Sequence, residues 1–394
     1  MKQTSGFIST YSADSFGVCS ALFELGGMIV MHDASGCNST YTTHDEPRWY
    51  DTDGMVYISG LTEIEAIMGD DGKLISDVIE TARELRPAFI AIVGTTIPAM
   101  TGFDVNAAVN IIESETGIPA FGFGTTGMRS YIHGAEEAFL RLAERVVKKD
   151  LKKSEKTTAN ILGLTPLDFS VNGSVDSIRE WLGKQGIEII SSWAMGSRLT
   201  DIEKAGTAHL NYVVSESGLK VAYRLKSMFG TPYKIGIPIG GEDISLEKCY
   251  SEDVNEENII TIFYKKRYDT DKKVRNLSLE QKDDICREMK NADVIVIGEG
   301  VSSKSLAAYI NMKTEYCTVA LTATDICEDD IKEIIMSGEN LKAVIADPLF
   351  KPICKKTYDN KELKFIPVPH EAFSGRLFRN DIPDLIKDVS IIVL

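Results

Sequence analysis

The sequence predicts an α/β protein in which parallel sheets carry helices on both faces. Apolar runs of strand length alternate with amphipathic stretches of helix length. This alternating pattern occurs three times in succession along the 394 residues. The strand candidates are continuously apolar, which is typical of parallel strands that are buried on both faces. A chain of this length forms two or three domains, and three successive α/β modules fit the pattern best.

The first module occupies residues 1–156. We expect strands at 27–31, 88–93 and 119–123, and helices at 73–85, 106–115 and 135–149. Basic residues in the last turn of 135–149 suit the carboxyl end of a helix dipole. The charged run at 148–156 predicts a linker to the next module.

The second module occupies residues 157–287 and the third residues 288–394. We expect strands at 159–164, 187–191 and 210–214 with helices at 174–185 and 218–229, then strands at 292–298, 318–322, 343–347 and 365–368 with a helix at 302–311. The segment 249–290 is polar and highly charged, and its pattern resolves poorly into elements.

Charge and apolar content argue against several classes of function. The formal net charge is −15, which repels phosphate backbones and anionic lipid, so we expect neither nucleic acid nor a membrane surface as a partner. No apolar run is long enough to span a bilayer and no signal peptide is present, so we expect a cytoplasmic protein. The seven cysteines include no CxxC pair, which argues against a zinc ribbon and leaves free thiols or metal ligands.

Nucleotide motifs are missing from the chain. There is no P-loop, and the turn Gly298-Glu299-Gly300 lacks the third glycine of a dinucleotide fingerprint. We therefore expect no nucleotide on this chain and interpret that turn as a plain strand-to-helix connection.

The strongest candidate site is the turn at Gly36-Cys37, which follows the apolar strand 27–31. Small residues at the end of such a strand present side chains and amides at the ligand-binding edge of an α/β sheet. Cys37 is either a small buried residue or a metal ligand. His32 either bonds a turn carbonyl or orients a cluster or substrate, and Asp33 and His44 are possible ligands besides cysteine.

Three further segments carry polar groups next to expected strands. Residues 43–50 include His44, Arg48 and two aromatic side chains, which form either a solvated loop or a site for a planar acidic ligand. The threonines at 95 and 96 follow a strand and favour a helix cap. The loop that contains His370, Ser374 and Arg376 also follows a strand, where substrate contacts are common.

Several segments, read in order, resemble the component 1 family of nitrogenase-type oxidoreductases. The segments are 32–37 (HDASGC), 61–69 (LTEIEAIMG), 93–98 (VGTTIP) with 101–104 (TGFD), 229–233 (FGTPY) and 370–375 (HEAFSG). The resemblance implies three Rossmann-like domains around a central cleft. It implies pairing with a sister subunit or a second copy, an iron–sulfur cluster of the 4Fe–4S type at the subunit interface, and a P-loop, ATP-dependent iron protein as reductase.

The resemblance also implies which positions would serve a cluster or a cofactor. The family's first cluster cysteine falls near Ala13 or Asp14, the second matches Cys37, and the third position is Thr96. The cysteine that holds the nitrogenase cofactor aligns with Ser215, and His370 lies one residue out of register with the cofactor histidine. These departures argue against dinitrogen reduction. One cysteine cannot supply the four thiolates that usually hold a cubane, so a partner or other ligands must complete it.

We therefore predict an oxidoreductase subunit that accepts electrons from the iron protein and reduces a small substrate such as a tetrapyrrole or a metal-bound ligand. Gly36, Cys37, His32 and Thr96 would surround the cluster, with Cys37 as the metal ligand. The expected substrate contacts are His44, Arg48, Ser215, His370, Ser374 and Arg376. The alternative is a cluster-free scaffold or binding protein for a metal complex or cofactor precursor.

Overall fold

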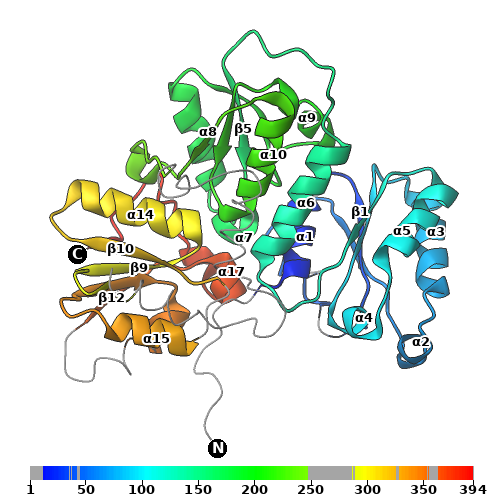
Figure 1. The fold of residues 1–394 in the computed structure, drawn as a ribbon, viewed down its shortest axis with the longest axis horizontal. Helices are drawn as coiled ribbons and strands as arrows, with labels where there is room; N and C mark the ends of the chain where they lie inside the picture. Colours follow the sequence, from blue (N-terminus) through cyan, green and yellow to red (C-terminus); the bar gives the residue numbers. More distant parts are fainter. Residues whose placement is uncertain are drawn as a thin grey trace, which may run out of the picture.

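The protein contains three four-stranded parallel sheets in the part of the chain that the structure describes (Figure 1). This computed structural model describes residues 12–34, 36, 38–41, 45–246, 286, 289–324, 328–352, 354 and 363–393. The predicted fold class is confirmed. Within these residues no helix is both long and apolar enough to cross a membrane.

The first sheet has the order β2-β1-β3-β4. Its strands are β1 (Met28–Met31), β2 (Met55–Ile58), β3 (Ile90–Val93) and β4 (Ala120–Phe123). Helices α3 (Gly72–Leu85) and α5 (Val105–Thr116) cover one face, and α1 (Asp14–Leu22) and α6 (Tyr131–Arg145) cover the other (Figure 1). Helix α3 packs there because Leu74, Val78 and Ala82 repeat every four residues and share one face.

The second sheet has the order β6-β5-β7-β8. Its strands are β5 (Thr158–Leu162), β6 (Glu188–Ser192), β7 (Leu210–Val213) and β8 (Tyr233–Ile235). Its helices are α7 (Pro166–Phe169), α8 (Ser174–Lys184), α9 (Leu199–Ile202) and α10 (Leu219–Phe229). The short 3-10 segment Glu216–Gly218 joins β7 to α10 and lies at the edge of the site described below.

The third sheet has the order β10-β9-β11-β12. Its strands are β9 (Val294–Gly298), β10 (Thr318–Thr322), β11 (Ala343–Ala346) and β12 (Lys364–Pro367). Helices α14 (Gly300–Lys313) and α15 (Glu328–Met336) lie on its two faces, and α17 (Glu371–Ser374) follows β12 (Figure 1).

All three sheets have the same topology, in which the first strand lies between the second and the third. The chain therefore changes direction beside the first strand of each sheet, and such switch points open a crevice at the carboxyl ends of the strands. The largest apolar cluster runs through elements of all three sheets. The modules thus share a core, and the domain boundaries at 156 and 287 stay a prediction.

Several elements were not expected from the sequence. They include β2, β8, α15, α2 (Glu63–Met68) and α4 (Thr96–Thr101), and the one-turn helices α7, α9 and α17. The strands β2 and β8 are short edge strands with partly exposed side chains, so they lack the continuous apolar run that marks a central strand. Most of the segment 249–290 lies outside the described residues.

Candidate functional site

His32 lies at the switch point of the first sheet, directly after β1. Its Nδ1 is 2.9 Å from Ser59 Oγ, and its ring packs against Phe103 with centroids 4.6 Å apart. The His32 carbonyl accepts a 2.8 Å bond from Thr95 Oγ1. Burial lowers the pKa of His32, so the imidazole is neutral at pH 7. The ring contacts a hydroxyl and not the turn carbonyl of the first expectation, and the second expectation, that it orients a cluster or substrate, stays a prediction.

Thr96 begins α4 but does not cap it. Its hydroxyl donates to the carbonyl of Thr126 at 2.8 Å, and Thr95, at the N-cap position, makes no side-chain bond to the helix. The predicted cap by these threonines is therefore wrong, because both hydroxyls bond to neighbouring segments instead.

The cysteine turn is described only in part. The Gly36 amide donates to the carbonyl of Ala34 at 2.8 Å, and the Gly36 carbonyl accepts a 2.9 Å bond from Ser39 Oγ. Cys37 and His44 lie outside the described residues. Their predicted roles stay predictions.

Asp14 occupies the position near which the first cluster cysteine was expected. Its carboxylate is buried and accepts bonds from the backbone amides of Ser15 at 2.8 Å, Thr126 at 3.1 Å and Gly127 at 2.7 Å. Burial raises the pKa of Asp14, while the three amides act in the opposite direction. Among the described residues, no group of three or more His, Cys, Asp or Glu side chains could hold a metal ion. The described side chains alone therefore do not supply the ligands of a cluster.

An apolar surface lies beside the cysteine turn, and we call it the α2–α4 surface. It is formed by Ile64, Ile67, Met68, Ile97 and Met100. The three side chains from α2 are each 74% exposed, Met100 is 82% exposed, and α2 buries none of its residues. The amide of Leu61 donates to the carbonyl of Asp33 at 2.8 Å, which holds the start of this segment next to the cysteine turn.

The segments that form the α2–α4 surface are rich in carboxylates, and Lys73, which follows them at the start of α3, is close enough to act on Glu65. Segments 61–71 and 95–104 contain Glu63, Glu65, Asp70, Asp71 and Asp104 but no lysine or arginine. The negative charges of Asp70 and Asp104 help burial to raise the pKa of Asp71, which shows that these carboxylates lie close together.

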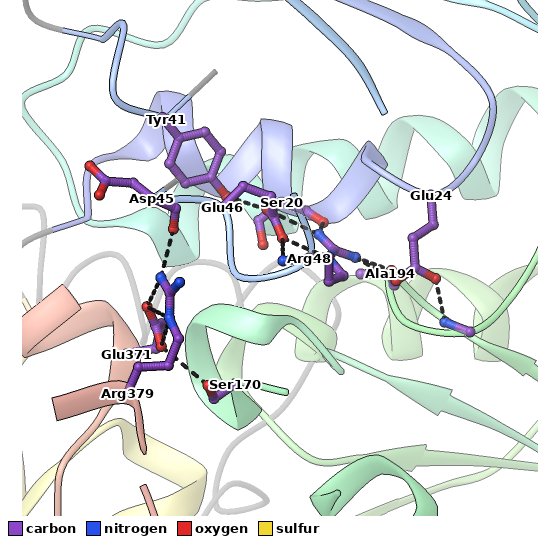
Figure 2. Close-up of polar contacts among 11 residues, drawn as sticks. Ser20, Glu24, Tyr41, Asp45, Glu46, Arg48, Ser170, Ala194, Glu371 and Arg379 are labelled. Carbon is purple, nitrogen blue, oxygen red and sulfur yellow. Dashed lines mark hydrogen bonds and ion pairs between the residues drawn. The ribbon is translucent and has the colours of Figure 1, made fainter. Parts of the chain in front are cut away.

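Arg48 is buried and fully bonded within the chain (Figure 2). Its five N–H donors reach the carboxylates of Glu46 and Glu24 and the carbonyls of Ser20 and Ala194, with the shortest distances at 2.7 Å. The guanidinium therefore ties the loop after the cysteine turn to the second module. All five of its donors are bonded within the chain, which leaves none for the predicted substrate contact.

The segment after β12 is held by a second ion-pair network (Figure 2). Arg379, which the sequence did not single out, pairs with Glu371 and donates to the carbonyl of Asp45. Glu371 also accepts a 3.2 Å bond from Ser170 Oγ. These contacts join the third module to the first and the second.

Ser374 and Arg376 are not brought to the cavity described next. The Ser374 hydroxyl donates to the carbonyl of His370 at 3.2 Å. Arg376 is half-exposed and its Nε lies 3.7 Å from Asp45 Oδ1. Both side chains were predicted substrate contacts, and neither lines the cavity.

A cavity of about 90 Å³ opens between the carboxyl edges of the second and third sheets. Apolar side chains such as Ile239, Ile345 and Phe373 form most of its wall. The polar groups on the wall include His370 and Asp168. The structure thus places His370 on the wall of this cavity, and its role in substrate contact stays a prediction.

Asp168 is the site residue that the sequence analysis missed. Its Oδ1 lies 3.6 Å from His370 Nε2, and its carboxylate accepts bonds from the hydroxyls of Tyr131, Thr165 and Ser215. Ser215, the predicted cofactor-position residue, therefore lies behind Asp168 rather than on the cavity wall. The sequence could have indicated Asp168 by its position alone, since it follows β5 at the carboxyl edge of the second sheet.

Buried carboxyl groups gather next to His370. Burial lowers the pKa of His370 to about 4, which leaves the ring neutral at pH 7. Burial raises the pKa of Asp168 to about 6 and that of Glu299 to about 8, and the neighbouring Glu216 contributes to both shifts. Glu299 accepts the Glu216 amide at 2.7 Å and the Ser302 amide at 2.8 Å.

Sequence comparison places residues 15–259 in a single family, described as Nitrogenase component 1 type Oxidoreductase. The Nitrogenase iron-molybdenum cofactor biosynthesis protein NifE of Clostridium pasteurianum is 26% identical over 74% of this chain and 62% of its own length. NifE of Methanosarcina barkeri is 26% identical over 50% of this chain and 44% of its own. A subunit of the light-independent protochlorophyllide reductase of Dinoroseobacter shibae is 31% identical over 27% of this chain and 20% of its own.

Structure comparison agrees at the level of the fold. A solved structure described as Nitrogenase Cp1 at pH 6.5 superposes with a TM-score of 0.55 and 17% identity, covering 88% of this chain and 63% of that one. The chain thus spans less than two thirds of each of these relatives. Because the family match covers more than half of this chain, the protein belongs to the nitrogenase component 1 type oxidoreductases.

Proposed function

We propose that this chain is one subunit of a nitrogenase-like reductase. It would pair with a different chain at the α2–α4 surface, complete an iron–sulfur cluster there through Cys37, and receive electrons from an ATP-dependent iron protein. The observation that carries the proposal is the exposed apolar surface directly beside the cysteine turn. Large exposed apolar patches on soluble proteins mark sites of association.

The α2 helix itself argues for a partner. A helix of six residues is too short to be stable through its own hydrogen bonds, and α2 buries no side chain in this chain. Its capping box, formed by Thr62 and Glu65, fixes its start but adds only about 1 kcal/mol. A partner that covers Ile64, Ile67 and Met68 would supply the missing burial.

The charges favour a chain of different sequence over a second copy. A twofold contact brings the same patch of both copies together. The five carboxylates around the α2–α4 surface would then face one another, which costs binding free energy. A partner with an apolar centre and lysine or arginine at its rim fits better, and the resemblance suggests a sister subunit whose cysteines complete the cluster.

The cavity limits the size of the proposed substrate. Its volume is about 90 Å³. Sites for drug-sized ligands measure roughly 300–1,000 Å³. The cavity is smaller than such sites, which favours a small substrate over a whole tetrapyrrole. The proposed substrate is a small unsaturated or metal-bound group that contacts His370.

Anaerobic co-purification with a sister chain tests the proposal. Iron and sulfide should accompany the complex, and both should fall in Cys37→Ala. Met100→Glu should abolish the complex, because a carboxylate would be buried among apolar side chains and other carboxylates. Met312→Glu is the matched control, since Met312 is 57% exposed on α14 in the third module. Full iron content in Cys37→Ala would refute the cluster assignment, and a stable Met100→Glu complex would refute the docking surface.

The second candidate is a cluster-free scaffold for a metal complex or cofactor precursor. It is supported by the NifE relatives, which are described as cofactor biosynthesis proteins, and by the lack of a metal-ligand group among the described residues. Electron paramagnetic resonance of the reduced complex separates the two candidates. An iron–sulfur signal that requires this chain would exclude the scaffold without a cluster.

A further inference from the structure

The wall of the cavity carries negative charge and no positive charge to balance it. Asp168 and Asp347 contribute carboxylates, and the described residues that line the cavity include no lysine or arginine. The Asp347 oxygens accept the backbone amides of Leu349 and His370, both at 2.9 Å. Asp168 accepts no backbone amide among the described residues. Its negative charge is therefore less well compensated by hydrogen-bond donors than that of Asp347.

Asp168 is held firmly in this position. Its side chain is 2% exposed, and it accepts hydroxyl bonds from Tyr131, Thr165 and Ser215. Hydroxyl groups are dipoles and bring no positive charge. Glu216 and Glu299 lie near the same carboxylate, and neither side chain can supply a positive charge to balance it.

The imidazole of His370, in contrast, is available to form hydrogen bonds with a ligand. Neither ring nitrogen has a hydrogen-bond partner among the described residues. The 3.6 Å from Nε2 to Asp168 Oδ1 is too long for a hydrogen bond. The ring otherwise packs edge-on against Phe373, with centroids 5.0 Å apart. A ligand in the cavity can therefore satisfy His370 while it lies within reach of the Asp168 charge.

We infer that Asp168 determines the ligand class of this cavity, which takes a small neutral or cationic molecule hydrogen-bonded to His370 and excludes anions. Exclusion follows because an anion next to a buried carboxylate meets strong repulsion at low effective dielectric. The inference deepens the proposed function, on which it rests, by naming the charge class of its substrate. Asp168 acts here as a specificity-determining residue.

Three probes of one shape and different charge test the inference. Acetamidine is a cation, acetamide is neutral and acetate is an anion, and each has four non-hydrogen atoms. Their binding is followed at pH 8 by the ring signals of the five histidines in nuclear magnetic resonance spectra, with His370→Gln to assign the signal. We expect acetamide and acetamidine to shift the His370 signal and acetate to bind at least about tenfold more weakly. Equal binding of acetate and acetamide, or no shift with acetamide, would overturn the inference.

Variants of Asp168 then assign the effect to this carboxylate. Asp168→Asn should bring acetate binding to within about twofold of acetamide, whereas Asp168→Glu should keep the discrimination. Asp14→Asn is the matched control, because Asp14 is also a 2% exposed carboxylate but lies in the first module. Unchanged discrimination in a folded Asp168→Asn would overturn the assignment. If that variant does not fold, the order of the three probes on the natural protein still decides.

These outcomes are separable from those of the proposed function. The probes require neither a cluster nor the iron protein. A chain that carries no iron but discriminates against acetate would refute the electron-transfer proposal alone. A chain with a full cluster that binds acetate as well as acetamide would refute the ligand class alone.

Discussion

Replacing Arg48 by methionine tests how the first module is fastened to the second. The Arg48 guanidinium is 3% exposed and bonds Glu46, Glu24 and the carbonyls of Ser20 and Ala194 (Figure 2). Methionine keeps most of the apolar stem but loses the guanidinium, whose central carbon lies 4.9 Å from the centroid of the Phe23 ring. The variant therefore removes the charge and the donors but little volume.

The expected loss of stability follows from what is left behind. The Glu46 carboxylate is fully buried, and among the described residues it would keep the hydroxyl of Tyr41 and the amide of residue 48 as donors. Breaking a buried ion pair from one side costs about 3–5 kcal/mol, because the remaining charge is uncompensated. Arg224→Met is the control, since Arg224 and Glu144 form an exposed pair at 3.4 Å that is worth about 0–1 kcal/mol.

Urea unfolding followed by tryptophan emission provides the assay. Trp193 is buried and precedes Ala194, so it reports on the segment that Arg48 holds. Circular dichroism of the whole chain should be recorded in parallel, because proteins with several modules need not unfold in one step. Adding Glu46→Gln to the methionine variant should restore part of the loss by removing the lone charge. A loss in Arg48→Met no larger than in Arg224→Met would refute the reasoning.

Two further predictions concern the buried carboxyl cluster and one strained turn. Because the pKa of Glu299 is raised to about 8, its protonated form stabilises the fold fully below about pH 4.5, and this contribution is lost as pH rises through 8. Glu299→Gln should therefore flatten the decline of the unfolding free energy between pH 6 and pH 9, and parallel curves for the two proteins would contradict the assignment. Ala194 has a φ of +84°, a region that only glycine adopts without strain, whereas Ala208 has a φ of −71°. Both methyl groups are buried, so Ala194→Gly should be more stable than Ala208→Gly by about 1–2 kcal/mol in thermal unfolding; equal stability would show that the turn is not strained.

Much of the fold could be predicted because local patterns encode it. The expected strand at 318–322 matches β10 in both bounds, and the expected helix at 174–185 matches α8 to within one residue. These segments have periodic or continuous apolar residues. The helix expected at 135–149 instead begins at Tyr131, because the aromatic ring at its first turn is buried against elements that no local pattern reveals.

The candidate site was predicted less completely. His370 was expected at a ligand site and lies on the cavity wall, whereas Arg48 was expected to face a ligand and is bonded on all sides. A sequence pattern shows that an arginine stands next to aromatic residues, but it cannot show that Glu24 and Ala194 converge on it from distant segments. Asp168 was missed for the same reason, since its neighbours Tyr131 and His370 come from other modules.

The sequence by itself determined the class of fold, the order of its elements and the family, because apolar periodicity and short ordered motifs are properties of neighbouring residues. The tertiary structure decided which polar groups meet. It brought the carboxyl edges of two sheets together around His370, set Asp168 beside it, and left the α2–α4 surface uncovered. Such contacts join residues that are far apart along the chain, and their charge, burial and reach are fixed only when the three sheets pack into one core.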